Sequence, residues 1–131
     1  IISYIENQKS NMYVYFTVDT LEFLRRGGRL TGFQSAIGSV LNIKPTIELK
    51  DGELKLLEKA RGKTKAIKGI IDRIPESVKA ISVCHILSEK EAQNLKANLE
   101  TRYPKARISI DVLGSVIGCH LGPGGIGICF Y

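Results

Sequence analysis

The sequence lacks the features of membrane-spanning, secreted and disordered proteins. No apolar run approaches the length of a membrane-spanning helix, because charged residues or glycines interrupt every one. Cysteine is scarce, and Cys84, Cys119 and Cys129 each lie in a short apolar, strand-like run. This pattern predicts reduced, buried thiols of a cytoplasmic protein rather than a disulfide framework or a zinc site. No signal peptide is visible, although the chain opens on Ile1 rather than on methionine.

The composition is that of an ordinary globular protein. A length of 131 residues predicts one domain, spanning residues 1–131, that is large enough to bury its own core. Nineteen basic residues against thirteen acidic ones leave a net charge of +6. Such an excess is compatible with nucleic acid, an acidic partner, an anionic ligand or mere solubility, so the position of the charges matters more than their sum.

Apolar periodicity predicts an α/β fold bordering on α+β. We expect two layers, with a mixed β-sheet and helices packed mainly on one face. The predicted strands are 12–18, 46–49, 53–57, 79–86 and 107–112, and the predicted helices are 21–26, 33–41, 61–74 and 88–103.

Local signals set several of these boundaries. Lys50-Asp51-Gly52 is a hairpin signal, and Pro45 is expected to close the helix before it. Two capping boxes are expected, one from Asp19 or Thr20 with Glu22 and one from Ser88 with Glu91.

The last sixteen residues, 116–131, hold a Gly/Pro-rich turn flanked by two apolar runs. Four glycines and a proline between Leu121 and Gly127 exclude a helix there, so we expect strand, tight loop, strand. His120 stands at the mouth of this turn and can donate a hydrogen bond to an anionic group; a hydrogen-bonded structural role is the alternative. The glycines form a poor phosphate cradle, because neither a Walker lysine nor a following helix accompanies them.

Other polar residues are weaker candidates, and no catalytic constellation is present. For His85, in a predicted strand, a structural role is favoured. Arg29 follows Gly27-Gly28 and is suited to a ligand carboxylate, while an internal ion pair or a contact with a backbone carbonyl is equally open.

One face of the predicted helix 61–74 is basic. Arg61, Lys65 and Lys68 align on it, and Lys63 lies close by. Such a face is usually just solvated, but docking to an acidic surface is a second interpretation. A nucleic-acid interface is weakened by the scarcity of aromatic residues around it.

Four segments carry a family resemblance when taken in order. They are Phe16-Thr-Val-Asp-Thr-Leu-Glu-Phe-Leu-Arg-Arg-Gly-Gly-Arg-Leu30, Ile37-Gly-Ser-Val-Leu-Asn-Ile-Lys-Pro45, Glu58-Lys-Ala-Arg-Gly-Lys-Thr-Lys-Ala66 and Val116-Ile-Gly-Cys-His-Leu-Gly-Pro-Gly-Gly-Ile-Gly127. Together they resemble the C-terminal domain of the DegV family of bacterial fatty-acid-binding proteins.

The resemblance implies a function. Family members bury one long-chain fatty acid between two domains and present it to a fatty acid kinase, which forms an acyl phosphate for phospholipid synthesis. The carrier is not itself an enzyme, and neither a metal nor a cofactor other than the bound lipid is implied. The N-terminal domain, whose hydroxyl residues hold the carboxylate, has no counterpart in this chain, so an exposed cleft that favours self-association is expected.

The resemblance also implies roles for residues. His120 matches the headgroup histidine, and Arg29 is assigned beside it. The acyl-tail pocket is expected to include Phe33, Ile37, Val40, Leu41, Ile117 and Gly118. The kinase-docking surface is expected to include Arg61, Lys63, Lys65 and Lys68. A nucleic-acid or regulatory protein-binding module that uses the face 61–68 is the alternative function, and an enzyme using His120 is a weaker third.

Overall fold

The computed structural model describes residues 1–32, 34–38 and 43–131. Six strands within these residues form one sheet, in the order β3–β2–β1–β6–β4–β5. β4 and β5 run parallel, whereas every other pair of neighbours is antiparallel. The strands are β1 (Tyr13–Thr17), β2 (Lys44–Lys50), β3 (Glu53–Ala60), β4 (Ala80–His85), β5 (Arg107–Val112) and β6 (Ile126–Phe130).

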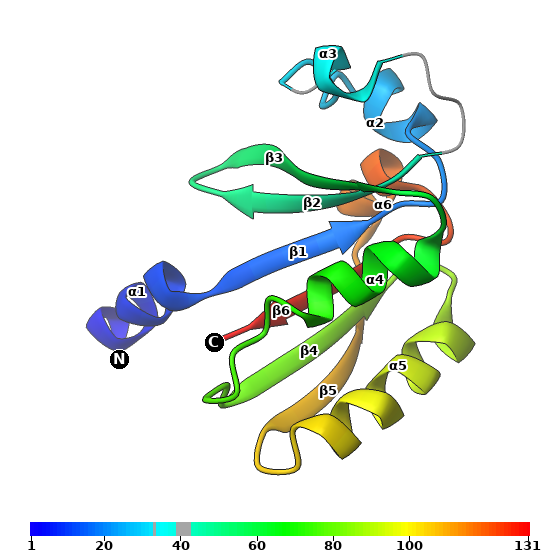
Figure 1. Ribbon diagram of the computed structural model, residues 1–131. Helices are drawn as coiled ribbons and strands as arrows, with labels where there is room; N and C mark the ends of the chain where they lie inside the picture. The colour runs from blue at the N-terminus through cyan, green and yellow to red at the C-terminus, as the bar shows by residue number, and fades with distance from the viewer. Residues whose placement is uncertain (33, 39–42) are drawn as a thin grey trace.

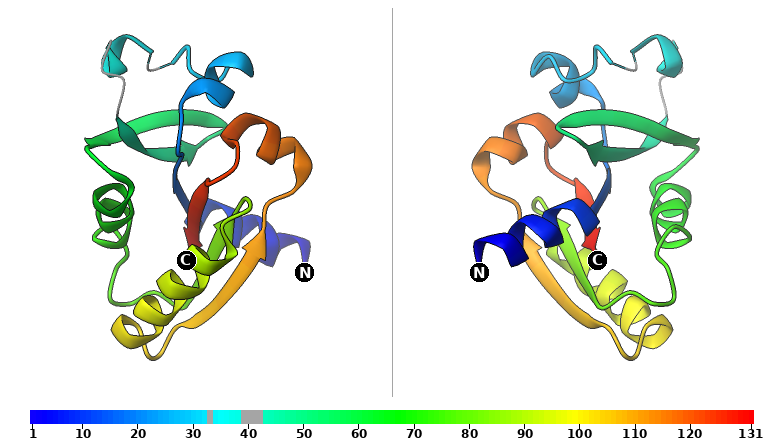
Figure 2. Two further views of the ribbon diagram at one scale, coloured as in Figure 1. Left: turned by 90° about the vertical axis from the view of Figure 1, so that its right-hand side faces the viewer. Right: turned by 90° about the vertical axis from the view of Figure 1, so that its left-hand side faces the viewer.

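The helices fall into groups around this sheet (Figures 1 and 2). α4 (Lys63–Ile71) and α5 (Glu89–Arg102) cover one face. α2 (Glu22–Arg26), α3 (Gln34–Ile37) and α6 (Ser115–Leu121) gather near the end of the sheet where β1 finishes. The predicted α/β fold with a mixed sheet is confirmed. The helices are not mainly on one face, however, because α2, α3 and α6 contribute to a second apolar cluster apart from that of α4 and α5.

Two apolar clusters form the core, one on each face of the sheet. Adjacent residues of β1 divide between them, because successive side chains of a strand point to opposite faces. Tyr15 packs with Ile70 of α4 and Leu95 of α5, whereas Phe16 packs with Leu24 and Leu121. The second cluster therefore joins α2 and α6 to the sheet.

The β2–β3 hairpin forms as predicted. Asp51 and Gly52 have φ angles of 54° and 79°, and two successive positive φ angles are typical of the type I′ turn that joins antiparallel strands. Pro45, however, does not end a helix. It lies near the start of β2, where a missing N–H is tolerated, and pairs with Lys59. The predicted boundary was therefore wrong.

The expected strand before the glycine turn is a helix, α6. Only one glycine, Gly118, interrupts residues 115–121, and its N–H donates to the Gly114 carbonyl as an ordinary helical bond of 2.9 Å. A hairpin is excluded there because β6 is already paired with β1 on one side and β4 on the other. The glycine-rich run 122–125 is indeed not helical, but it joins a helix to a strand.

Two further segments differ from expectation. The structure describes the helix predicted over 33–41 only as α3, and Phe33, Val40 and Leu41 lie outside the described residues. Residues 2–11, for which no element was predicted, form α1 (Ile2–Asn11), which buries none of its side chains. It extends from the start of β1, away from α2 and α6 (Figure 1). None of the described helices is long and apolar enough to cross a membrane.

The cysteines follow the prediction only in part. Cys84 is buried in β4, and Cys129 is half-buried in β6 with its sulfur 4.0 Å from that of Cys84. Cys119 is exposed on α6 rather than buried in a strand. All three are free thiols.

Candidate functional site

The turn 122–125 packs closely against the segment that leads from β1 into α2. Gly122 and Gly124 have φ angles of 76° and 84°, which favour glycine. A side chain would be blocked at both positions, because a Cβ on Gly122 would overlap the Phe23 ring and one on Gly124 would overlap the Asp19 carboxylate. The bare backbone predicted for this turn is therefore occupied by neighbouring parts of the chain rather than by a phosphate.

His120 lies in the last turn of α6 and faces α2. Its Nδ1 atom abuts Gly27, where a Cβ would overlap it. This nitrogen is buried and has no hydrogen-bond partner among the described residues. Among the described residues, the fold therefore leaves the hydrogen-bonding capacity of this one nitrogen unused.

Arg29 approaches the same glycine from another direction. Its Nη1 atom donates to the Gly27 carbonyl oxygen at 2.8 Å, so one of the open alternatives, a contact with a backbone carbonyl, is present. The side chain is otherwise exposed, and a guanidinium group has further N–H donors for an anion. A hollow of about 720 Å³ opens beside Arg29 and is lined in part by Gly32, Leu54 and Leu56. His120 and Arg29 thus converge on Gly27.

The described residues of the expected acyl-tail pocket lie in different surroundings. Ile37 is buried in the second apolar cluster. Ile117, on α6, is 48% exposed, and the neighbouring Val116 is 76% exposed. Gly118 is half-buried between Ile117 and His120. α6 therefore presents an uncovered apolar side.

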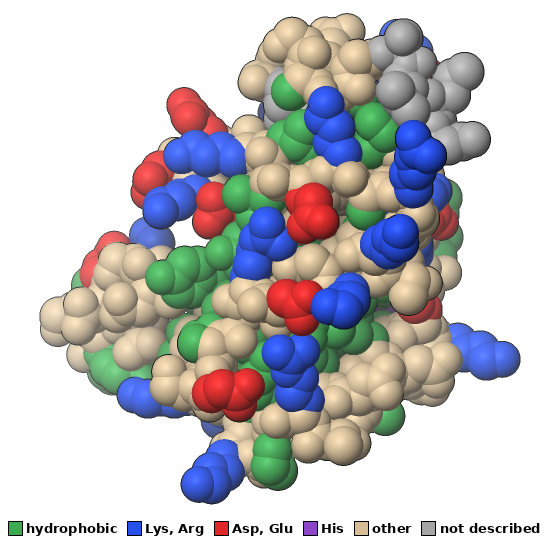
Figure 3. Space-filling model, in the orientation of Figure 1, with side chains coloured by type: hydrophobic (Ala, Val, Ile, Leu, Met, Phe, Trp, Pro, Cys, Tyr) green, Lys and Arg blue, Asp and Glu red, His purple; other side chains and the backbone are tan. Residues whose placement is uncertain are grey.

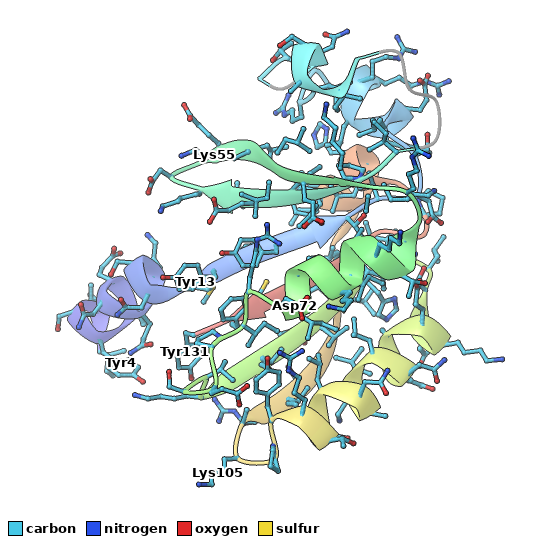
Figure 4. The ribbon with its side chains drawn as sticks, viewed as in Figure 1. Tyr4, Tyr13, Lys55, Asp72, Lys105 and Tyr131 are labelled. Atoms are coloured by element: carbon cyan, nitrogen blue, oxygen red, sulfur yellow. The ribbon has the colours of Figure 1, made fainter. Side chains whose placement is uncertain are left out.

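The expected basic face divides into exposed residues and one inward residue. Arg61, Lys65 and Lys68 are exposed, and Lys68 pairs with Asp72 at 2.5 Å. Figure 4 labels Asp72 near the C-terminal end of α4, and Figure 3 shows basic side chains interspersed with acidic ones over this side of the molecule. The side chain of Lys63 is only 17% exposed.

The Lys63 ammonium group is engaged within the protein. It lies 2.6 Å from Glu91 Oε2 and 3.4 Å from Asp19 Oδ1, and it donates to the Gly124 carbonyl oxygen at 2.5 Å. Lys44 adds a longer pair to Asp19, at 3.8 Å. Asp19, Glu91 and Phe23 were missed as neighbours of the turn, since sequence patterns carry no signal for contacts this distant along the chain.

Neither expected capping box forms, because the glutamate of each box bonds basic side chains instead. The Ser88 side chain makes no capping bond to α5, and Glu91 is held by Lys63 instead. At α2 the Thr20 hydroxyl accepts the Glu22 N–H at 3.3 Å, but the Glu22 carboxylate bonds Arg25 and Arg26. His85 fits its structural role, because its buried Nδ1 accepts the Ser88 N–H at 3.3 Å.

The site has no metal-binding character within the residues that the structure describes. No group of three or more His, Cys, Asp or Glu side chains there could hold a metal ion. Its chemistry is that of an imidazole and a guanidinium group beside apolar surface. This combination is suited to holding one anionic group at the end of an apolar ligand.

Comparison with known proteins gives a consistent result. A family model described as "Uncharacterised protein, DegV family" matches residues 1–131. A DegV domain-containing protein of Clostridium perfringens is 36% identical over 99% of this chain and 47% of its own length. The crystal structure of DegV, a fatty acid binding protein from Bacillus subtilis, has 36% identity and a TM-score of 0.84 over 98% of this chain and 48% of that one.

A second solved structure agrees with the first. A DegV family protein from Thermus thermophilus, described by its fatty acid binding, has 34% identity and a TM-score of 0.81, covering 99% of this chain and 49% of that one. The chain thus spans about half the length of the relatives that it matches.

The loss of stability at acidic pH should depend in part on Glu22. Hydrogen bonds from Arg25 and then Arg26 lower the pKa of its carboxyl from 4.5 to about 2. A pKa that is lower in the folded state stabilises the fold above the unfolded value, and this contribution is lost as the pH falls from 4.5 towards about 2. Urea unfolding should therefore show that Glu22→Gln is less stable than the parent at neutral pH. The two proteins should be equally stable near pH about 2. Glu53→Gln, at an exposed position, is the control. If Glu22→Gln were still less stable than the parent at pH about 2, the lowered pKa of Glu22 would not explain the difference.

The contact between α2 and α6 is tested by Gly27→Ala. Gly27 has a φ of −75°, which alanine adopts readily, so the cost arises from the methyl group, which would overlap the His120 ring and lie close to the Phe23 carbonyl oxygen. We expect a loss of about 1–3 kcal/mol in the free energy of unfolding from this overpacking.

A double-mutant cycle makes this test specific. Much of the cost should disappear when Gly27→Ala is combined with His120→Ala, because the ring is then absent. Gly114→Ala is the matched control, since its φ is −65° and no atom lies within 4 Å of the added Cβ. Equal effects at Gly27 and Gly114 would show that the ring does not occupy this place.

Proposed function

The chain belongs to the DegV family, and on that premise we propose that it is the acyl-tail half of a fatty-acid carrier. The observation that carries the proposal is its likeness to the fatty acid binding protein DegV of Bacillus subtilis, which extends over 98% of this chain at 36% identity. We place this chain as the C-terminal domain of a two-domain protein. Its role is to bind, not to catalyse, and we assign it to the bacterial cytoplasm.

The headgroup end of the proposed site uses His120 and Arg29. The unpartnered Nδ1 of His120 supports this assignment, and so does the guanidinium group that converges on Gly27. Hydrogen bonds to an ionised carboxylate are stronger than those between neutral groups, so two donors orient the acid firmly. The remaining carboxylate ligands are assigned to the part of the relatives' length that this sequence does not cover.

The tail end relies on apolar burial. Each methylene removed from water contributes roughly 0.8 kcal/mol, so a long acyl chain supplies most of the affinity if both walls are present. The exposed Ile117 and Val116 support one wall on α6. Phe33, Ile37, Val40, Leu41 and Gly118 remain predicted pocket positions. Where this apolar surface is left uncovered, it favours self-association.

The proposed partner is a fatty acid kinase that phosphorylates the bound carboxylate. Arg61, Lys65 and Lys68 support a docking surface, because they are exposed on or next to α4. Lys63 is left out of that surface, since its ammonium group is engaged internally. Electrostatic attraction of this kind mainly raises the rate of association and suppresses wrong partners.

Fatty-acid binding is tested with the chain alone and with the chain joined at Ile1 to the N-terminal half of Bacillus subtilis DegV. Mass spectrometry after denaturation should detect a copurified fatty acid, and titration with palmitate should show binding. His120→Ala should weaken palmitate binding about tenfold, the equivalent of one charge-assisted hydrogen bond, while far-ultraviolet circular dichroism stays unchanged. If neither form copurifies with or binds a fatty acid, the proposed fatty-acid function is wrong. If His120→Ala binds palmitate as tightly as the parent, the role of His120 is structural.

The docking surface is tested by charge reversal. The combined change Arg61→Glu, Lys65→Glu, Lys68→Glu should lower the rate of phosphate transfer by the kinase without altering palmitate affinity. Reversal of Lys90 and Lys105, which are exposed elsewhere, is the control. A steep fall of polynucleotide binding with salt, abolished by the same triple change, would instead favour the nucleic-acid alternative. An unchanged transfer rate would remove the docking assignment.

A further inference from the structure

Lys63 is the one basic residue of the segment 61–68 that is turned into the protein. Three acceptors from separate parts of the chain surround its ammonium group: Glu91 of α5, Asp19 after β1 and the carbonyl of Gly124. With its side chain 17% exposed, Lys63 is far less accessible than Lys68, at 72%. Because its ammonium group already has these three acceptors, Lys63 is less suited than Lys68 to bind an external partner.

The turn that Lys63 contacts is held on its opposite side as well. The Gly124 N–H donates to the Ile86 carbonyl at 2.9 Å, and the Ile86 N–H donates to the Gly125 carbonyl at 3.0 Å. Gly124 therefore has its N–H bound to the end of β4 and its carbonyl bound to α4. The Asp19 carboxylate lies against the same residue, so that the turn has contacts in several directions.

His120 lies only two residues before this turn. The Gly122 N–H donates to the Gly118 carbonyl at 2.8 Å, which makes Gly122 the end of α6. The intervening Leu121 is buried in the second apolar cluster. A shift of Gly122–Gly125 would therefore be passed to the last turn of α6, and with it to the imidazole that abuts Gly27.

We propose that Lys63 is a positioning residue, whose ammonium group, held by Asp19 and Glu91, fixes the turn 122–125 and so sets the orientation of His120. This inference rests on the proposed function, because orientation of His120 matters for a carboxylate that it binds. Asp19 and Glu91 act with it: each neutralises the lysine and directs it toward the Gly124 carbonyl. Lys63 itself touches no ligand.

The test compares Lys63→Met, which keeps the length of the aliphatic side chain, with Lys63→Arg and with Lys90→Met as a matched control. Lys90 is exposed at the start of α5, beside Glu91. Heteronuclear spectra of this chain follow the His120 ring resonance and the amides of residues 122–125. Palmitate titration of the joined protein measures affinity well below the melting temperature.

We expect Lys63→Met to displace the His120 ring resonance and the turn amides, and to lower palmitate affinity about tenfold, comparable with the loss of His120 itself. Lys63→Arg should keep the resonances and the palmitate affinity close to those of the parent, because arginine keeps the positive charge. Glu91→Gln should move the same resonances by less, and it provides the test if Lys63→Met does not fold. A role limited to stability would lower the melting temperature but leave the ring resonance and the affinity of the folded protein unchanged.

The two proposals fail separately. If the parent protein binds no palmitate, the fatty-acid function falls, while the His120 resonance still reports whether Lys63 positions the ring. If Lys63→Met matches Lys90→Met in the ring resonance and the turn amides, the positioning role is overturned whatever the lipid result. If the resonances move but affinity does not, Lys63 positions the turn without acting on binding, and the inference as stated is wrong.

Discussion

The close approach of the turn 122–125 to the start of α2 is the constraint on which the site depends. At Gly122 the approaching group is an aromatic ring, and at Gly124 it is a carboxylate. Neither approach is possible with a Cβ, and both residues have positive φ angles that other residues rarely adopt. The turn thus brings β6 into the middle of the sheet while α6 stays against α2. Removal of this contact would separate His120 from Gly27 and so from Arg29, which donates to the carbonyl of the same glycine.

Prediction from sequence succeeded where short-range chemistry decides the structure. The Asp51-Gly52 turn, the central strand β4 and the helix that stops before Pro104 each depend on residues a few positions apart. The strand predicted before Gly122 failed because its exclusion depends on a long-range fact, namely that both edges of β6 are occupied. Likewise His120 stood out as a lone histidine beside glycines, but the contact of Lys63 with Gly124 joins residues 61 positions apart. Such contacts leave no periodic trace in the sequence.

The apolar side of α6 is exposed in this structure. A helix in a complete domain ordinarily buries its apolar stripe, yet Val116 and Ile117 of α6 are turned outward while Leu121 is buried. The relatives that the chain matches are about twice as long as the sequence described. Burial of an acyl chain is favourable only where water is excluded on all sides. Under the proposed function, the exposed apolar side of α6 is the part of the chain suited to one wall of an acyl-chain site.

Helix α4 contributes residues both to the proposed docking surface and to the contacts that hold the turn 122–125. Its outer face presents Lys65 and Lys68, whereas Lys63 at its first turn reaches inward to the Gly124 carbonyl. Because Lys63 and Lys65 are two residues apart on one rigid helix, a protein docked on the outer face lies close to the residue that holds the headgroup turn. Burial of Ala66 and Ile70 against the sheet fixes this helix as a body, so that it cannot tilt without disturbing the core. Under the proposed function, docking on the outer face and the geometry of the headgroup turn would therefore be coupled through the packing of α4 on the sheet.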